Sequence, residues 1–141
     1  MPGRPWAAAS TTGSALGRSR STTGRRRGAP FGIAESGNHD NRNYEDDWAE
    51  KWQGLLTKDK NGVDNYDAHA NQKYAKNLKG RLLLAHGGMD DNVPPYNTWL
   101  VVDALVKANK DFDLILFPNA RHGYGEDSLY MTRRRWDYFV R

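Results

Sequence analysis

Apolar residues in this chain form short runs and helical stripes, and both patterns begin only after residue 30. Short apolar runs bounded by small or polar residues are typical of buried β-strands. Three segments fit this description: residues 31–36 (FGIAES), 81–87 (RLLLAHG) and 111–118 (DFDLILFP). Apolar residues recur at helical intervals in three others, which predicts helices within residues 45–55, 96–110 and 127–140. Between them, residues 57–80 are polar, and their KDKNGVDN stretch is typical of turns.

Strand and helix patterns alternate over residues 81–140, and this alternation sets the expected fold. The order strand, helix, strand, helix predicts an α/β fold with parallel strands and right-handed crossovers. In open sheets of this kind, ligands and catalytic groups lie at the carboxyl ends of the strands. The side chains that follow the strands at 81–87 and 111–118 are therefore the first candidates for a site.

The first 30 residues differ from the remainder in composition. They contain six arginines, no acidic residue and almost no branched aliphatic side chain. We expect segment 1–30 to be disordered, because it cannot bury enough apolar surface to form a core. A functional interpretation of this segment is a nucleic-acid-binding arm or an organelle transit peptide, since both are basic and contain few acidic residues. The arginines concerned are Arg4, Arg18, Arg20, Arg25, Arg26 and Arg27.

Nucleic-acid binding by this segment is not expected to be specific. Only Trp6 adds an aromatic ring near the arginines, so any contact would be nonspecific and salt-sensitive. Residues 31–141 hold 15 basic against 17 acidic side chains and are close to neutral.

Composition also limits the kinds of site and location. The chain has no cysteine, so it forms neither disulfides nor thiolate metal sites. It has no apolar stretch of the roughly 20 residues that span a bilayer and no signal-peptide segment, so we expect a soluble chain without membrane contact. The sequence does not indicate a cellular compartment for the protein. His39 and His69 stand in polar surroundings and are expected at the surface, and no metal or cofactor is expected.

An acid and a histidine follow consecutive predicted strands. Asp90 comes after the strand at 81–87, and His122 comes after the strand at 111–118. Acid then histidine is the second half of the order Ser, Asp or Glu, His in α/β-hydrolases. In such a triad the acid fixes the tautomer of the imidazole, and the imidazole takes the proton of the nucleophile. The order of the two residues therefore indicates a hydrolase.

The sequence around these residues resembles one family of serine peptidases. The stretch LLLAHGGMDDNVPPYNTWLVVDALVKANKDFDLILFPNARHGYG is similar to the end of the catalytic domain in the prolyl oligopeptidase family, in particular its dipeptidyl peptidase IV branch. The similarity extends upstream through SGNHDNRNYEDDWAEKWQGL, so that it covers residues 31–141. It implies that residues 31–141 are the C-terminal part of an α/β-hydrolase fold and act on peptide substrates.

The resemblance also implies roles for six residues. Asp90 falls on the acid of the triad, and His122 falls on its histidine. Asn92 matches an asparagine that hydrogen-bonds a substrate carbonyl, and Val93 matches a valine that lines the primary specificity pocket.

The remaining two are aromatic. Tyr44 and Trp48 match the pair that walls this pocket, with Trp48 in place of a tyrosine. Taken without the resemblance, these two rings are more typical of ordinary helix packing.

Two neighbouring residues have other readings. Asp91 stands beside the predicted acid, and such a carboxylate more often caps a turn or pairs with an arginine. At His86, the sequence HGG is similar to the HGGG oxyanion loop of esterases, which donates backbone amides. That loop lies upstream of its nucleophile, however, and the only serine after HGG here is Ser128.

The nucleophile is the member that the sequence does not supply. None of the six serines lies in a G-x-S-x-G elbow, including Ser19 in GRSRS and Ser36 in AESGN. We therefore interpret the chain as the C-terminal piece of a larger serine peptidase and expect it to be inactive alone. Alternatives are a noncatalytic peptide-binding module and an esterase fragment. An oligomer of the intact enzyme is compatible with the sequence.

Overall fold

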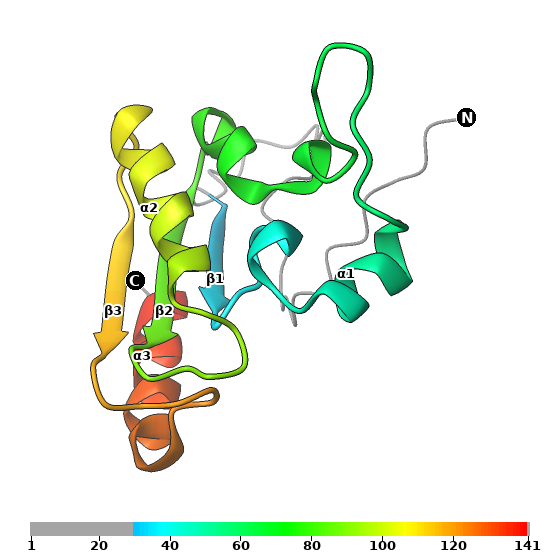
Figure 1. Ribbon diagram of the computed structural model, residues 1–141. Coiled ribbons are helices and arrows are strands. Elements are labelled where there is room, and N and C mark those ends of the chain that lie inside the picture. The colour runs from blue at the N-terminus through cyan, green and yellow to red at the C-terminus, as the bar shows by residue number, and fades with distance from the viewer. Residues whose placement is uncertain (1–29, 141) are drawn as a thin grey trace, which may run out of the picture.

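The computed structural model describes residues 30–140, and three parallel strands form its centre (Figure 1). The strands are β1 (Phe31–Glu35), β2 (Arg81–Gly87) and β3 (Asp113–Phe117), and they lie in the order β1-β2-β3. Phe31 pairs with Arg81 on one side of β2, and Asp113 pairs with Leu83 on the other. The predicted α/β fold with parallel strands is confirmed. The expectation of disorder falls on residues 1–30, of which 1–29 lie outside the described residues.

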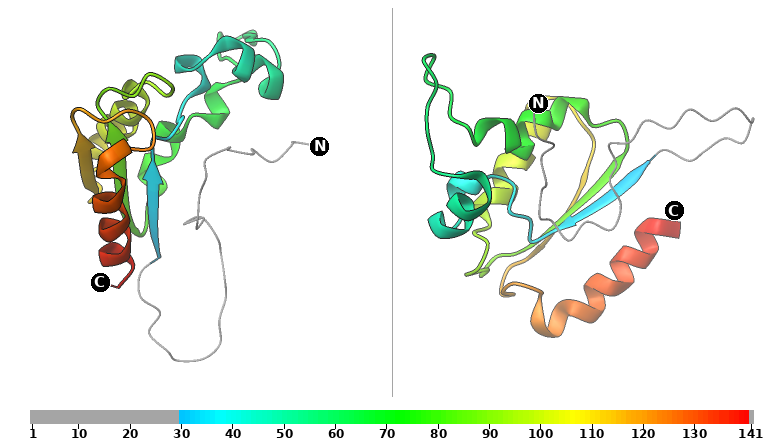
Figure 2. Two further views of the ribbon diagram at one scale, coloured as in Figure 1. Left: turned by 90° about the horizontal axis from the view of Figure 1, so that it is seen from below. Right: turned by 90° about the vertical axis from the view of Figure 1, so that its right-hand side faces the viewer.

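Helices cover both faces of this sheet (Figure 2). Helix α2 (Tyr96–Lys107) lies on one face and α3 (Ser128–Val140) on the other. The alternation of side chains along a strand divides the core accordingly, because successive residues point to opposite faces. The core on the α3 face consists of Ile33, Leu83, Ala85, Phe117, Ala120, Tyr124, Met131 and Tyr138. The core on the α2 face consists of Ala75, Leu84, Val101 and Leu105.

The connection from α2 to β3 is longer than the hydrophobic pattern predicted. The helix ends at Lys107 rather than near residue 110, and the strand begins at Asp113 rather than at 111. Asn109 adopts a left-handed conformation with φ of +51°, and the N–H of Lys110 returns to the carbonyl of Leu105 at 3.0 Å. Asparagine tolerates this conformation better than most residues, so it ends the helix here.

Residues 37–80 form the long connection between β1 and β2, and this connection lies beside the sheet (Figure 1). It contains α1 (Asp46–Gln53) and three 3₁₀ helices: η1 (Asn41–Asn43), η2 (Asp67–His69) and η3 (Asn71–Asn77). The last of these packs against α2 and contributes Ala75 to the core. These short turns carry no hydrophobic period, which is why the sequence predicted only a polar connection there.

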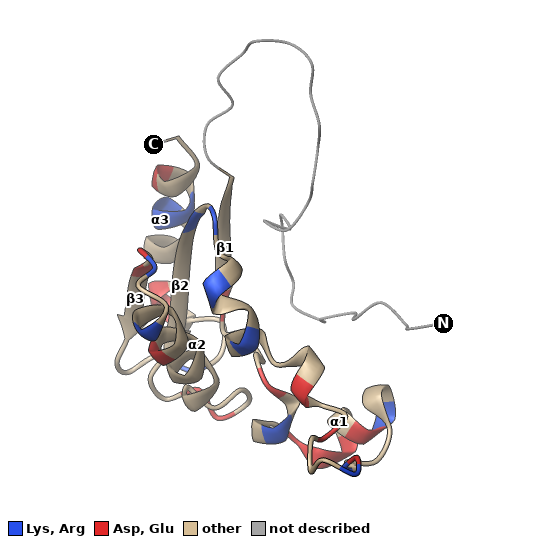
Figure 3. Ribbon diagram, turned by 90° about the horizontal axis from the view of Figure 1, so that it is seen from above, with Lys and Arg blue, Asp and Glu red and all other residues tan. Residues whose placement is uncertain are grey.

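The apolar side chains of α1 are largely exposed. The structure confirms the predicted helix, and Gly54 ends it with φ of +76°. Trp48 and Trp52 nevertheless expose 39% and 64% of their surface, and only Ala49 is buried in this helix. Leu55, just after the helix, exposes 68%. Acidic residues gather around α1 (Figure 3), and Asp46 and Asp47 in its first turn complement the helix dipole.

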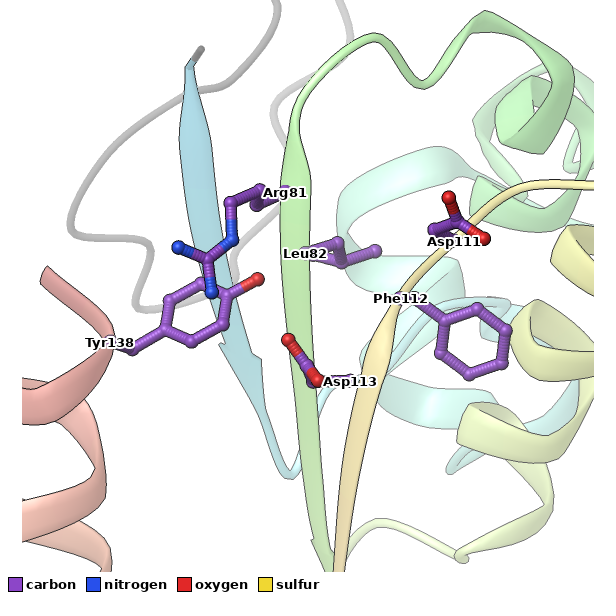
Figure 4. Close-up of a pocket in the computed structure, with 6 residues that line it drawn as sticks. All are labelled: Arg81, Leu82, Asp111, Phe112, Asp113 and Tyr138. Atoms are coloured by element: carbon purple, nitrogen blue, oxygen red, sulfur yellow. The ribbon is translucent and has the colours of Figure 1, made fainter. Parts of the chain in front are cut away.

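A small hollow of about 120 Å³ lies where β2 and β3 begin (Figure 4). The guanidinium of Arg81 stacks over the ring of Tyr138 there, 4.7 Å from its centroid. The other lining residues are Leu82, Asp111, Phe112 and Asp113. The predicted site residues that follow the strands lie at the opposite end of the sheet.

Candidate active site

Asp90 is buried directly after β2, and hydrogen bonds hold both of its carboxylate oxygens. Oδ1 accepts from the backbone N–H groups of Asn92 and Val93 at 3.0 and 2.9 Å. Oδ2 lies 2.9 Å from Nδ1 of His122. The side chain of Asp90 has no solvent exposure, so these donors replace the water that an ionised carboxylate needs. The orientation of the carboxylate is therefore determined within the protein.

His122 meets this carboxylate from the loop after β3 and remains open to solvent. Its side chain is 42% exposed. A carboxylate oxygen only accepts hydrogen bonds, so Nδ1 is the nitrogen that carries the hydrogen in this pair. Nε2 has no hydrogen-bond partner among residues 30–140. A neutral His122 in this tautomer presents Nε2 as a proton acceptor.

The two loops that carry these residues are joined by backbone hydrogen bonds. They lie side by side below the ends of β2 and β3 in Figure 1. The N–H of Gly88 donates to the carbonyl of Phe117 at 2.7 Å, and that of Met89 to the carbonyl of Ala120 at 3.0 Å. These two amides are occupied, so they do not form an oxyanion hole.

The pair of glycines before Asp90 has a steric cause. A Cβ at Gly87 would lie 2.5 Å from the carbonyl oxygen of Ala120 and 2.6 Å from that of Arg121. A Cβ at Gly88 would lie 2.6 Å from the carbonyl oxygen of Pro118. A Cβ atom does not approach a backbone oxygen this closely in real structures, so larger residues would separate the two loops. The glycines therefore permit the approach that brings Asp90 to His122.

Tyr124 anchors the loop of His122 to the core. It is buried, its ring lies 4.5 Å from that of Phe117, and its hydroxyl donates to the carbonyl of Ala85 at 3.2 Å. Burial raises the pKa of this hydroxyl to about 12, so it stays protonated and remains a donor. Its backbone has φ of +69°, and Gly123 before it has φ of +81°. These two left-handed residues turn the chain sharply after His122.

Asp91 points away from this pair. Its carboxylate binds Arg121 in an exposed ion pair, with Oδ2 and Nη1 2.5 Å apart. The expectation that Asp91 pairs with an arginine is confirmed. An ion pair of this kind at the surface contributes little to stability.

The four residues predicted to bind substrate are only partly brought together. The hydroxyl of Tyr44 donates to Oδ1 of Asn92 at 2.7 Å, although 48 residues separate them. The rings of Tyr44 and Trp48 meet edge to face at 6.3 Å. Trp48 and Asn92 are exposed, whereas Val93 is buried. The structure therefore joins the half-buried Tyr44 to Asn92 on one side and to Trp48 on the other. It leaves Trp48 exposed instead of packing it into the core as ordinary helix packing requires.

His39 is buried, contrary to the surface position predicted for it. Only 6% of its surface is exposed, and Nδ1 lies 2.9 Å from Nδ2 of Asn71. Burial, with a further contribution from His86, lowers its pKa from 6.5 to about 4. The reason for the wrong prediction is that η3 folds back over the loop and covers it. His69 is exposed, as predicted.

Three buried polar residues near the site were missed from the sequence: His86, Asn97 and Thr98. His86 ends β2 and is fully buried. Asn97 accepts from the N–H of Asp40 at 2.9 Å and donates to the carbonyl of Asn43 at 3.1 Å, so it ties the loop before Tyr44 to α2. The available signal was a histidine inside a buried strand, because a buried polar group requires a hydrogen-bond partner.

Within 30–140, no three histidine, aspartate or glutamate side chains are grouped so that they would hold a metal ion. In that range the structure also contains no helix with the length and hydropathy needed to traverse a bilayer.

The prolyl oligopeptidase family model matches residues 28–141. The chain belongs to the prolyl oligopeptidase family. It is 48% identical over 52 residues to dipeptidyl peptidase family member 1 of Caenorhabditis elegans, a match that covers 37% of this chain. It is 35% identical over 82 residues to human prolyl endopeptidase FAP, which covers 57% of this chain. The matches span only 6% and 10% of these two curated relatives.

A solved member of the prolyl oligopeptidase family has the same arrangement of elements. The crystal structure of Porphyromonas gingivalis dipeptidyl peptidase 4 superposes with a TM-score of 0.66 and 32% identity. The match covers 78% of this chain and 15% of that protein. Similarity at this level confirms that residues 30–140 have the fold of the corresponding part of a dipeptidyl peptidase, an α/β-hydrolase.

Proposed function

We propose that residues 30–140 form the acid–base half of a serine peptidase site, with Asp90 as the acid and His122 as the base. The observation that supports this most is the 2.9 Å contact between Nδ1 of His122 and a buried carboxylate. It leaves Nε2 of an exposed imidazole available for a proton, and it follows the strand order of an α/β-hydrolase triad.

The chemistry requires a hydroxyl that these residues do not supply. In the proposed reaction, Nε2 of His122 takes the proton of a serine hydroxyl as that oxygen attacks the scissile carbonyl. The same nitrogen then returns the proton to the leaving amine. Asp90 stabilises the imidazolium that forms between these steps. Since Ser36 and Ser128 lie outside any G-x-S-x-G sequence, the nucleophile comes from outside residues 30–140, and the 141-residue chain alone is inactive.

The substrate is a peptide with proline before the cleaved bond. The exposed ring of Trp48 meets the half-buried ring of Tyr44, whose hydroxyl contacts Asn92. A proline ring is small, apolar and suited to such a surface. The hydroxyl of Tyr44 fixes the side-chain oxygen of Asn92, which leaves its NH₂ group free to meet a substrate carbonyl. Val93, the residue after Asn92, is buried.

A chimaeric enzyme tests this proposal. The segment of Porphyromonas gingivalis dipeptidyl peptidase 4 that matches this chain is replaced by residues 31–140, and turnover of an Xaa-Pro p-nitroanilide is measured. We expect turnover that disappears in His122→Ala, and none from the 141-residue chain alone.

Two results would overturn the proposal. One is a folded chimaera whose turnover is unchanged by His122→Ala. The other is a folded chimaera that binds an Xaa-Pro dipeptide without hydrolysing the p-nitroanilide, which would favour the noncatalytic peptide-binding module.

A further inference from the structure

Asp90 lies between two imidazoles, only one of which takes part in the proposed chemistry. Nδ1 of His122 is 2.9 Å from Oδ2 on the solvent side, and Nε2 of His86 is 3.3 Å from the same oxygen on the buried side. His86 has no exposed surface. It therefore cannot meet a substrate, but it contacts the oxygen that binds His122.

The hydrogen-bond partners of His86 determine its tautomer. Nε2 lies 2.9 Å from the carbonyl oxygen of Val93, which only accepts, so Nε2 carries the hydrogen. Nδ1 lies 2.7 Å from the hydroxyl oxygen of Thr98, so in the neutral ring this hydroxyl donates to Nδ1. Thr98 belongs to the first turn of α2 and is 1% exposed.

Val93 joins His86 to the other oxygen of Asp90. Its N–H donates to Oδ1 at 2.9 Å, while its carbonyl accepts from His86. Hydrogen bonds thus link Thr98 to His86, His86 to Val93 and Val93 to Asp90. The series forms a closed ring, because Nε2 of His86 also lies near Oδ2 of Asp90. Without His86, Oδ1 would still be held by two backbone amides, but nothing among the described residues would fix Oδ2 from the buried side.

We propose that His86 and Thr98 are positioning residues, which orient Oδ2 of Asp90 so that it selects the Nδ1–H tautomer of His122. Thr98 acts through His86 by donating to Nδ1, which keeps the hydrogen of His86 on Nε2. This inference rests on the proposed function, in which that tautomer of His122 is the competent base. It adds two residues whose side chains touch neither the substrate nor the reacting atoms.

The test uses long-range ¹H–¹⁵N correlation spectra of the full 141-residue chain, labelled at histidine and recorded at pH 9, where ordinary imidazoles are neutral. In the wild type we expect His86 in the Nε2–H form and His122 in the Nδ1–H form. In Thr98→Val, which removes the hydroxyl at nearly constant volume, the ratio of Nδ1–H to Nε2–H forms of His122 should fall roughly threefold to tenfold, as expected for the loss of one net hydrogen bond.

Two variants separate positioning from general destabilisation. Thr98→Ser keeps the hydroxyl and should restore the wild-type ratio. Thr132→Val makes the same change in α3, where the hydroxyl donates to the carbonyl of Ser128 at 2.9 Å, and should leave His122 unchanged. A Thr132→Val effect as large as that of Thr98→Val would overturn the proposal.

The outcomes also separate this proposal from the proposed function. If wild-type His122 lacks the Nδ1–H form, both the proposed function and the positioning role of His86 and Thr98 fail. If His122 has that form and a folded Thr98→Val chain retains it, only the roles of His86 and Thr98 fail. Should Thr98→Val not fold, the wild-type spectrum decides, because a hydrogen on Nδ1 of His86 contradicts donation from Thr98.

Discussion

The two sides of the candidate site are built in different ways. On the acid–histidine side, Asp90 is buried and held by backbone amides, His86 and His122. On the aromatic side, Trp48 is 39% exposed, and Tyr44 is joined to the loop of Asp90 through a single hydrogen bond to Asn92. The geometry of the proposed base is thus determined within residues 30–140, whereas that of the aromatic surface is only weakly constrained. Substitutions should have large effects on the first side and small effects on the second.

The largest difference is expected at the two adjacent carboxylates. In the chimaeric enzyme, Asp90→Asn should lower kcat by roughly 10⁴, because the amide stabilises the wrong tautomer of the imidazole. Asp91→Asn, which loses only the exposed pair with Arg121, should lower kcat less than about tenfold. Steady-state kinetics on both variants measure this, and equal losses would show that the acid has been assigned to the wrong residue.

The buried His39 should make the stability of the fold depend on pH. The pKa of His39 is about 4 in the folded chain, where the ring is buried, and 6.5 in the unfolded chain, where it is not. As the pH falls, the unfolded state therefore binds a proton before the folded state does. The stabilisation is complete above pH 6.5 and is lost as the pH falls towards 4. Between pH 7 and pH 5 the free energy of unfolding should therefore fall by about 2 kcal/mol more in the wild type than in His39→Gln.

Urea unfolding at the two pH values measures this difference. His69→Gln is the matched control, because His69 is exposed, and it should keep the wild-type dependence. An unchanged pH dependence in His39→Gln would argue that His39 is not buried in solution.

The close approach of the two loops should be sensitive to one added methyl group. Gly87→Ala places a Cβ against two backbone carbonyl oxygens and should lower the free energy of unfolding by about 2 kcal/mol. Gly54→Ala is the control, since its φ of +76° makes alanine strained although nothing lies within 4 Å, and it should cost about 1 kcal/mol. Thermal and urea unfolding compare them, and an equal cost at both positions would contradict the steric account.

The smallest effect on stability is expected on the aromatic side. Trp48→Ala should lower the free energy of unfolding by less than about 1 kcal/mol, because the ring is exposed. Leu105→Ala, which truncates a smaller but fully buried side chain, should cost about 2–5 kcal/mol. In the chimaera, Trp48→Ala should raise KM more than it lowers kcat. A loss of stability as large as that of Leu105→Ala would mean that Trp48 is packed in solution.

Much of the fold follows from local pattern in the sequence. The run at 81–87 forms a strand that is buried from Leu83 onward, whereas the run at 111–118 forms a strand whose Leu114 and Leu116 are exposed. The amphipathic spacing of 127–140 matches α3 closely. Asp90 and His122 were predicted to lie near each other because they follow consecutive strands, and the structure brings them within hydrogen-bond distance.

Features set by contacts between distant segments were not predictable. The burial of His39 depends on Asn71, 32 residues later, and the contact of Tyr44 depends on Asn92. No role was predicted for His86 from the sequence, because an HGG oxyanion loop would have to precede a nucleophile and no G-x-S-x-G serine follows it. Its partner Thr98 lies in the first turn of α2, where a hydroxyl normally carries no special signal.

The central claim is that Asp90 holds His122 with the hydrogen on Nδ1 and leaves Nε2 as the base. The most direct measurement is the ¹⁵N shifts of the His122 ring at pH 9 in the full chain, compared between the wild type and Asp90→Asn. The account predicts a wild-type ring protonated at Nδ1 and a shift of the hydrogen to Nε2 in Asp90→Asn. A wild-type ring protonated at Nε2, or one that is indifferent to Asp90→Asn, would contradict it.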